Sequence, residues 1–457
     1  MKRNSEYIRL RQRLSRGLCA LSLVLMSAAA FAHDYVPGAD QSTPILLKGG
    51  DLYTVTDGTL RETDLLFDNG RITHIGRNIT PPPGTEVIDV SGMRVYPGLI
   101  APETRIGLTE IGAVRATNDA AETGSITPEV QAHIAYNPDS EVIPTIRSNG
   151  ITTAIITPAG SLVRGRSSLL NLDGWTKEDA SEKLNAGLSV SWPSVSIVTA
   201  WWMTQTPEEQ KKNQKKNRKR LQTAFEDARA YWTAIRAGTE IERDLRWEAM
   251  LPVFDKKMPV FITANDYRQI DQALSFAEEF DLNIVIVGGA ESWKIADKLR
   301  RQDIPVILRR THSAPYRDDD DYDLAFRVPL LLKEAGVRFC FSYIYSSPSS
   351  WDTRSLPFQA GQAIAFGLDE ATALRAVTLS TAEILGVADV LGSLENGKKA
   401  TIVVSEGDIL DQLTNRVVYE FIEGRRVDLN NRHKELFEKY RQKDLNGTDR
   451  QKELSQR

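Results

Sequence analysis

Short hydrophobic runs separated by turn residues make up residues 44–93. The runs lie in ILLKGGDLYTV, TDLLFDNGRITHIG and EVIDVSGMRVYPG, with Gly-Gly, Asn-Gly and Pro-Pro-Pro-Gly stretches between and within them. β-Branched runs bounded by such residues predict short strands, and Asp68-Asn69-Gly70 predicts a tight hairpin. Because strands of this length cannot form a large barrel, we expect a small β-sandwich here.

After Pro97 the pattern changes to longer apolar runs that alternate with amphipathic segments. The apolar runs include GITTAIITPAG, MPVFITAND, LNIVIVGG, IPVILRR and VRFCFSYIY, and segments such as DQALSFAEEF lie between several of them. This order predicts a parallel sheet covered by helices, and its length suits a TIM-type (β/α)8 barrel with insertions. A doubly wound open sheet is the alternative, but no GxGxxG phosphate loop supports it.

Residues 206–236 predict one long helix inserted in the barrel. Thr206 and Glu209 fit a capping box, and Leu221, Phe225, Ala228 and Trp232 are expected to pack inward. Its many lysines and arginines are interpreted as a solvated helix face and not as a nucleic-acid site. The neighbouring Trp201-Trp202 pair is expected to pack in the core, and the alternative is that it shapes a lid.

Strand and turn patterns return at 392–427, in GSLENGKKATIVVSEGD and NRVVYEFIEGRRV. A β region on each side of the barrel predicts one composite sandwich assembled from both ends of the mature chain. The predicted organisation is a leader at 1–32, sandwich segments at 33–96 and 389–428, a barrel at 97–388, and a tail at 429–457 that begins helical and ends disordered.

The leader combines a basic segment with an uncharged apolar run. That run, LCALSLVLMSAAAFA, ends in Ala30-Phe31-Ala32, a small-x-small cleavage pattern. These features predict a cleaved signal peptide and a periplasmic location. A membrane anchor is the alternative, but the run is shorter than the roughly 20 residues that a span needs, so no stable anchor is expected.

Charge and cysteine content narrow the choices further. The leader carries six basic residues and one acidic residue, so its removal takes the formal net charge from −4 to −9. An acidic protein is not expected to bind nucleic acid. Outside the leader Cys340 is the one cysteine, so we expect no internal disulfide and predict a buried strand residue.

Several segments together carry a resemblance to a known family. VYPGLI precedes the first barrel strand, LPFQAGQAIAFGLDEATALRAVTLSTAEILGV lies where the barrel closes, and GSLENGKKATIVVSEGDIL and FIEGRRV follow. This arrangement resembles the amidohydrolase superfamily, closest to its imidazolonepropionase-like and prolidase-like branches. The resemblance implies a TIM-type barrel, and by family hydrolysis of carbon–nitrogen bonds other than ordinary peptide bonds, or of short peptides.

The resemblance also implies a divalent metal at the carboxyl end of the barrel. Its usual ligands are a His-x-His pair after strand 1, histidines after strands 5 and 6, and an aspartate after strand 8. In this sequence those positions hold, in order, Glu103 and Arg105, Thr263, Gly288, and Ile344, or Tyr343 if the register shifts by one.

Because arginine cannot bind a metal and most of these residues are not ligands, we predict no metal cofactor. Zinc or another divalent ion is expected only if Glu103 forms a new site with His133, His312 or other acids.

The barrel mouth remains the predicted binding location. The segment SLVRGRSSLLNLDGW, expected to follow the second strand, offers Arg164, Arg166, Ser167, Ser168 and Asp173. Arginines there suit a small anionic or amide ligand. The alternative is that Glu103 and Arg105 pair with neighbours and fill the space of a metal. The candidate ligand-binding residues are Glu103, Arg105, Arg166, Thr263, Asn265, Arg309, His312 and Tyr343.

Two functions remain open at this point. The first is an exported, non-catalytic binding protein or partner subunit, which associates with an active amidohydrolase relative or with copies of itself. The alternative is a hydrolase acting on carbon–nitrogen bonds through an altered site around Glu103, His312 and nearby arginines. No catalytic residue is assigned from the sequence.

Overall fold

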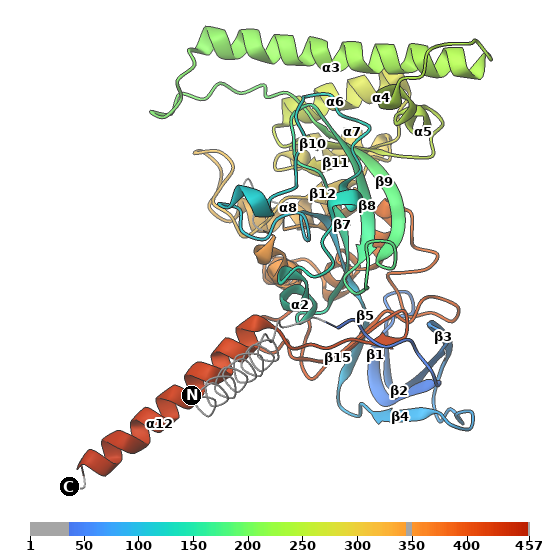
Figure 1. Ribbon diagram of the computed structural model, residues 1–457. Helices are drawn as coiled ribbons and strands as arrows, with labels where there is room; N and C mark the ends of the chain where they lie inside the picture. Colours follow the sequence, from blue (N-terminus) through green and yellow to red (C-terminus); the bar gives the residue numbers. More distant parts are fainter. Residues whose placement is uncertain (1–35, 344–349, 456–457) are drawn as a thin grey trace, which may run out of the picture. The chain divides into compact units, whose positions relative to one another are not determined.

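The computed structural model describes residues 36–343 and 350–455, with side chains to residue 443 (Figure 1). The predicted leader, and Ile344 among the proposed ligand positions, lie outside the described residues. The chain divides into two units, Met1–Val36 and Pro37–Arg457, and the fold described below is that of the second unit.

One eight-stranded sheet joins the two ends of the second unit. Its strands follow the order β16-β15-β14-β5-β1-β2-β3, and β4 also pairs with β1. The antiparallel pairing of β14 with β5 links the strands before the barrel to those after it. The strands are β1 (Ile45–Tyr53), β2 (Thr59–Asp68), β3 (Arg71–Gly76), β4 (Glu86–Asp89), β5 (Arg94–Pro97), β14 (Ile402–Ser405), β15 (Val417–Ile422) and β16 (Arg425–Arg426).

This sheet folds over its own core. Phe67 of β2 and Phe421 of β15 pack edge to face with ring centroids 5.0 Å apart, although β1, β5 and β14 separate their strands in the sheet. The predicted hairpin is confirmed between β2 and β3, where Asn69 and Gly70 have φ values of 48° and 72°. Such left-handed residues match the twist of a two-residue hairpin turn.

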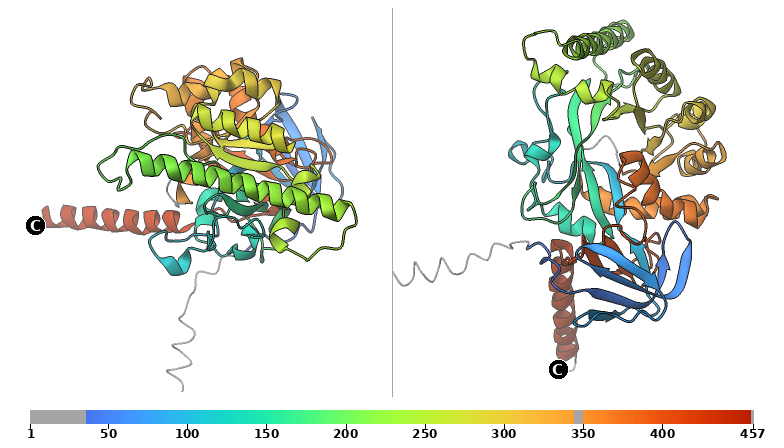
Figure 2. Two further views of the ribbon diagram at one scale, coloured as in Figure 1. Left: turned by 90° about the horizontal axis from the view of Figure 1, so that it is seen from above. Right: turned by 90° about the vertical axis from the view of Figure 1, so that its right-hand side faces the viewer.

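The second eight-stranded sheet forms the wall of a nearly closed barrel, which confirms the predicted TIM-type fold (Figures 1 and 2). Backbone hydrogen bonds from Ile100 to Val377 (3.0 Å) and from Phe341 to Ala376 (3.1 Å) bridge its first and last strands. In chain order the strands are β6 (Leu99–Thr104), β7 (Ile151–Ile156), β8 (Val163–Asn171), β9 (Ser181–Ser191), β10 (Val260–Ala264), β11 (Ile284–Gly288), β12 (Val306–Leu308) and β13 (Phe339–Phe341).

The strand β8 departs from the expected all-parallel order. It pairs antiparallel with both β7 and β9, whereas its neighbours from β9 to β13 run parallel. The segment SLVRGRSSLLNLDGW follows the second barrel strand, β7, as expected, and its residues Val163–Asn171 form a strand of the wall themselves. Almost all residues of this segment are buried, as expected for a strand inside a sheet whose two faces are both covered.

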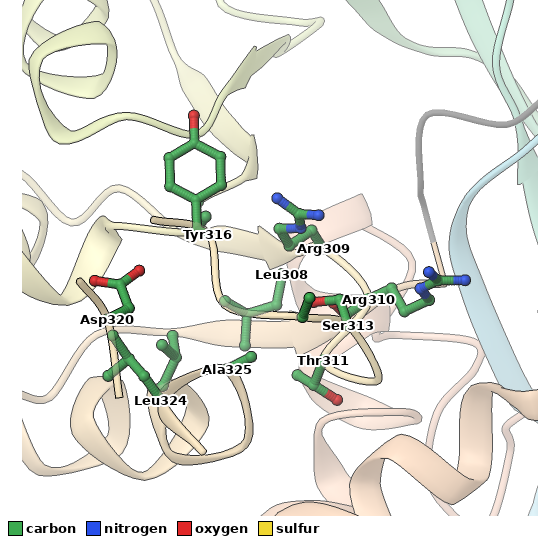
Figure 3. Close-up of a pocket in the computed structure, with 13 residues that line it drawn as sticks. Leu308, Arg309, Arg310, Thr311, Ser313, Tyr316, Asp320, Leu324 and Ala325 are labelled. Carbon is green, nitrogen blue, oxygen red and sulfur yellow. The ribbon is translucent and has the colours of Figure 1, made fainter. Parts of the chain in front are cut away.

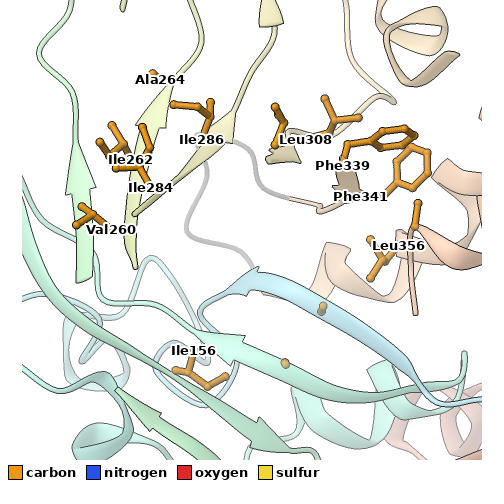
Figure 4. Packing of buried hydrophobic residues seen from close by; sticks show 14 of the residues in the cluster. Ile156, Val260, Ile262, Ala264, Ile284, Ile286, Leu308, Phe339, Phe341 and Leu356 are labelled. Atoms are coloured by element: carbon orange, nitrogen blue, oxygen red, sulfur yellow. The ribbon is translucent and has the colours of Figure 1, made fainter. Parts of the chain in front are cut away.

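Helices cover the outside of the barrel strands (Figure 2). Figure 4 shows Ile262, Ile286 and Leu308 with Phe341 and Leu356 in the apolar cluster on this outer side. The helices are α2 (Val142–Arg147), α3 (Pro207–Arg236), α4 (Leu245–Glu248), α5 (Leu251–Phe254), α6 (Tyr267–Phe280), α7 (Ala296–Arg301), α8 (Leu324–Glu334), α9 (Leu356–Ala365), α10 (Glu370–Arg375), α11 (Leu379–Leu385) and α12 (Arg432–Ser455), with 3-10 turns η1 (Arg115–Thr117), η2 (Ala132–Ala135), η3 (Ser292–Ile295) and η4 (Trp351–Ser355).

A separate apolar layer fills the barrel interior. Ile100, Phe261, Ile307 and Cys340 belong to one buried cluster with Leu385 and other residues of α11 and of the segment that follows it. The prediction that Cys340 is a buried strand residue is confirmed. Burial raises the pKa of its thiol to about 12, so the thiolate needed for nucleophilic chemistry does not form near neutral pH.

The long helix α3 has the predicted capping box between Thr206 and Glu209. Leu221, Phe225 and Ala228 are buried as expected. The expectation for Trp201 and Trp202 was wrong, because these side chains are 95% and 59% exposed on the segment that leads into α3. Among the described helices, none combines the length and apolar character needed to cross a bilayer.

Candidate functional site

A chain of hydrogen bonds, called the inner chain below, crosses the barrel interior next to the apolar layer. Ser189 Oγ of β9 lies 2.7 Å from Ser167 Oγ of β8. Ser167 donates to Thr157 Oγ1 at 3.1 Å, and Thr157 donates to Glu103 Oε2 at 2.9 Å. Strand alternation explains this layer, because Ser167 is two residues from the inward-facing Leu169.

Arg164 continues this chain to the far wall. Its Nη1 lies 3.9 Å from Glu103 Oε1, and its Nη2 donates to Thr263 Oγ1 at 3.0 Å. Thr263 is two residues beyond the inward-facing Phe261 on β10, so alternation also places it on the inner face. A single buried guanidinium therefore connects the ends of β6 and β10.

Burial dominates the ionisation of this group. It raises the pKa of the Glu103 carboxyl, and the positive charge of Arg164, the Thr157 hydrogen bond and Arg105 oppose that rise. Burial likewise lowers the pKa of Arg164, which Glu103 opposes. Arg105 is half-buried, and its side chain makes no hydrogen bond or ion pair with the residues that the structure describes. The site thus holds one carboxyl group that faces two arginines.

The residues at these strand ends do not fit a divalent metal. Within the described ranges no group of three His, Cys, Asp or Glu side chains comes together. Gly288 ends β11 with a φ of 104°, and a Cβ atom there would lie 2.6 Å from Asn265 Oδ1. A histidine at position 288 would meet both strain and a clash. That these strand ends correspond to the family's ligand positions stays a prediction.

His133 and His312 are not brought to Glu103 by any described contact. His133 Nδ1 lies 3.1 Å from Ser168 Oγ, on the opposite face of β8 from Ser167. His312 packs edge to face with Phe326, at a centroid distance of 6.3 Å. Burial, with Arg310 as a further cause, lowers the pKa of His312. The structure therefore gives no support for a new metal site built from Glu103 and these histidines.

A pocket lies beside the segment that follows β12. Figure 3 shows Arg309 and Tyr316 at this pocket, and the Arg309 guanidinium is 5.6 Å from the Tyr316 ring centroid. Arg310 reaches in another direction and lies 5.6 Å from the Tyr343 ring. The two consecutive arginines thus contact different aromatic rings. The binding role predicted for Arg309 and Tyr343 stays a prediction.

An ion network holds the segments after β10, β11 and β12 together. Arg317 Nη2 contacts Asp266 Oδ2 at 2.9 Å and Glu291 Oε2 at 2.8 Å, and Lys294 lies 2.7 Å from Glu291 Oε1. Although burial opposes it, hydrogen bonds from Arg317 and Lys294 lower the pKa of Glu291 to about 2. Hydrogen bonds led by Arg268 also overcome burial and lower the pKa of Asp266.

The predicted candidates are therefore distributed over several places. Glu103 and Thr263 join the inner chain, with Arg105 close by. Asn265 packs against Gly288, and its Oδ1 has no hydrogen-bond partner among the described residues. Arg166 donates to the Glu129 carbonyl at 2.9 Å, outside the inner chain.

Sequence analysis placed Arg164 and Ser167 on the segment expected at the barrel mouth but did not count them among the candidate ligand-binding residues. It did not name Thr157 or Ser189, the other members of the inner chain. Arg164 and Arg166 are two residues apart, so alternation predicts that they share a face. A register shift between Val163 and Gly165, with Gly165 at a φ of 121°, breaks this rule. A glycine between two arginines in a strand is the signal that marks such an irregularity.

Comparison with known proteins agrees with the fold. No protein-family model matches the chain. An amidohydrolase structure from Thermotoga maritima is 27% identical, with a TM-score of 0.74 over 84% of this chain and 99% of that one. D-hydantoinase of Geobacillus stearothermophilus is 43% identical over 81 residues, 18% of this chain and 16% of that protein. Dihydropyrimidinase of Dictyostelium discoideum is 31% identical over 171 residues, 37% of this chain and 28% of that protein.

The barrel and its composite β domain define a TIM-type fold, and the polar strand ends are the candidate site. The chain belongs to the amidohydrolase superfamily, as its sequence resemblance predicted. It spans less than a third of the length of either of these two curated relatives, whose activities therefore belong to those proteins. The finer prediction of an imidazolonepropionase-like or prolidase-like branch stays a prediction.

Proposed function

We propose that this protein hydrolyses the carbon–nitrogen bond of a small cyclic amide or short peptide, with Glu103 as general base. One observation carries the proposal. Glu103 is a buried carboxyl group with a raised pKa, and Thr157 holds it at the barrel end where Arg105 and Arg164 supply positive charge. A buried carboxyl group with a raised pKa beside positive charge is suited to act in proton transfer.

The proposed reaction uses residues of this chain throughout. The Glu103 carboxylate takes a proton from water, and the resulting hydroxide adds to the carbonyl carbon of the amide. Arg105 and Arg164 stabilise the negative oxygen of the tetrahedral intermediate. The carbon–nitrogen bond then breaks, and the leaving nitrogen receives the proton from Glu103. A carboxylic acid and an amine result, and Glu103 returns to its starting state.

The relatives support the choice of substrates. Their names describe action on hydantoins and on dihydropyrimidines, both of which are cyclic amides. The first assay therefore offers hydantoin, dihydrouracil and a proline-containing dipeptide to the purified protein, and product amine or ring opening is measured.

Replacement of Glu103 tests the role of the base directly. Glu103→Gln keeps the size of the side chain and an oxygen that can accept from Thr157, but it cannot take a proton. We expect turnover to fall by about 10²–10⁴-fold with little change in stability. Glu122→Gln, at an exposed position, is the matched control. Undiminished turnover in Glu103→Gln would remove Glu103 as base.

A non-catalytic binding or partner role is the second candidate. Its support is that Glu103 is 3% exposed and that both of its oxygens face neighbours, Thr157 and Arg164, as expected for side chains that fill a site. This candidate predicts no turnover of any test substrate, with co-purification of an active relative. Export is also proposed, and N-terminal sequencing of the protein from fractionated cells tests cleavage after Ala32.

A further inference from the structure

We propose that the guanidinium of Arg164 is the fixed cation of this site, in place of the family's divalent metal. It donates hydrogen bonds to an oxygen of a carbonyl or carboxylate ligand. The use of this cation in hydrolysis rests on the proposed function. The replacement of one cation by another does not, because it follows from the position of Arg164 in the barrel.

Arg164 lies between two strand ends where the family resemblance puts metal ligands. Its guanidinium faces Glu103 from β6 at 3.9 Å and Thr263 from β10 at 3.0 Å. The side chain is 5% exposed, so it is enclosed by the barrel wall and does not reach in from solvent. The Arg164 guanidinium thus contacts residues at two positions where the family resemblance implies ligands of a divalent metal.

The local charge favours this arrangement over a metal. Glu103 is the one carboxylate described in contact with the guanidinium, and Arg105 adds a second positive charge nearby. At short range in a poorly hydrated interior, like charges repel strongly. A divalent ion entering here would meet two arginines and gain only one carboxylate. The arginine already provides the charge that a carbonyl oxygen needs.

Arg164 also has hydrogen-bonding capacity left for a ligand. A guanidinium carries five N–H donors, and Thr263 accepts from one of them. The distance to Glu103 exceeds that of a hydrogen bond. The buried Nε has no partner among the described residues. A buried donor without a partner is costly, so an oxygen that accepts from it would stabilise the complex.

Chemical rescue tests this role without any need for turnover. Arg164→Ala removes the guanidinium and leaves a space of the same shape. We expect a lower Tm, and we expect millimolar guanidinium chloride to raise the Tm of this variant by about 2 °C or more, as for a ligand that binds the folded state. Sodium chloride at equal ionic strength should not do so. The matched control is Arg166→Ala, on the same strand but outside the inner chain.

Metal content is measured on the same samples. The wild type should retain less than about 0.1 equivalents of zinc or manganese after incubation and desalting, and EDTA should leave its Tm unchanged. Near one equivalent in the wild type would overturn the proposal. A response of Arg164→Ala to guanidinium no different from that of Arg166→Ala would overturn it as well.

If Arg164→Ala does not fold, Arg164→Lys keeps a cation, and the wild-type metal content still decides the question. Rescue without turnover of any substrate would contradict the proposed hydrolysis but would support the assignment of Arg164. Turnover that depends on Glu103 and on bound zinc would support the proposed hydrolysis but would overturn the assignment of Arg164.

Discussion

Two arginine–carboxylate pairs are buried in the part of the chain that the structure describes, and they differ in how fully their hydrogen-bonding groups are used. Arg147 of α2 and Asp173 are both fully buried, and Arg147 Nη1 lies 2.9 Å from Asp173 Oδ1. Arg147 also donates to the carbonyls of Leu172 at 3.2 Å and Asp428 at 2.9 Å. Arg425 adds a second cation, 3.6 Å from Asp173 Oδ2.

The pair in the barrel is looser. Arg164 and Glu103 are 3.9 Å apart, and Arg164 has one described hydrogen bond, to Thr263. A buried pair whose groups are mostly satisfied holds parts of the chain in place, here barrel residues and the segment after β16. A buried pair that is only partly satisfied contributes less to folding and leaves donors for a ligand.

The largest expected effect is that of breaking the tighter pair. Arg147→Met leaves Asp173 buried without its closest cation and frees two carbonyl groups. The free energy of unfolding should fall by about 3–5 kcal/mol, as measured by denaturant titration. Arg375→Ala, which breaks the surface pair with Glu383, is the control and should change it little. A loss for Arg147→Met as small as that of the control would contradict the comparison.

A smaller effect is expected for the looser pair. Arg164→Met should lower the free energy of unfolding by about 1–3 kcal/mol, because Arg164 lies 3.9 Å from Glu103 and makes one described hydrogen bond, to Thr263. The two variants are compared in the same titration at neutral pH. If Arg164→Met costs as much as Arg147→Met, the barrel pair is a structural element of the same kind.

The ion network around Arg317 allows a test with pH. Its carboxylates, Asp266 and Glu291, have lowered pKa values, whereas Glu103 has a raised one. Although burial opposes it, the hydrogen bonds from Arg317 and Lys294 lower the pKa of Glu291 from its ordinary 4.5 to about 2. Its contribution to stability is therefore fully present above pH 4.5 and is lost as the pH falls toward 2. Glu103 has the opposite sign, since its contribution is present at low pH and is lost as the pH rises through its raised pKa.

Denaturant midpoints measured between pH 7 and pH 3 check this sign. We expect the wild type to lose stability as the pH falls below about 4.5. Arg317→Gln should begin less stable at neutral pH and lose less on acidification, because it removes the main hydrogen-bond donor to Glu291. Parallel curves for the two proteins would show that Arg317 does not set the acid response.

Much of the fold could be predicted from local patterns. Turn residues and β-branched runs identified the composite β domain, and the alternation of apolar strands with amphipathic helices identified the barrel. The capping box of α3 was visible because its two residues are three positions apart. The exposure of Trp201 was not, because hydrophobicity alone does not tell whether a connecting segment has anything to pack against.

For the candidate site, the sequence by itself determined which residue types stand at the strand ends, including Glu103 and Thr263. It also placed two arginines on one short segment, separated by Gly165. Only the tertiary structure decided that Arg164 enters the barrel and Arg166 does not. The physical reason is the register shift at Gly165, whose left-handed backbone turns the two side chains to opposite faces.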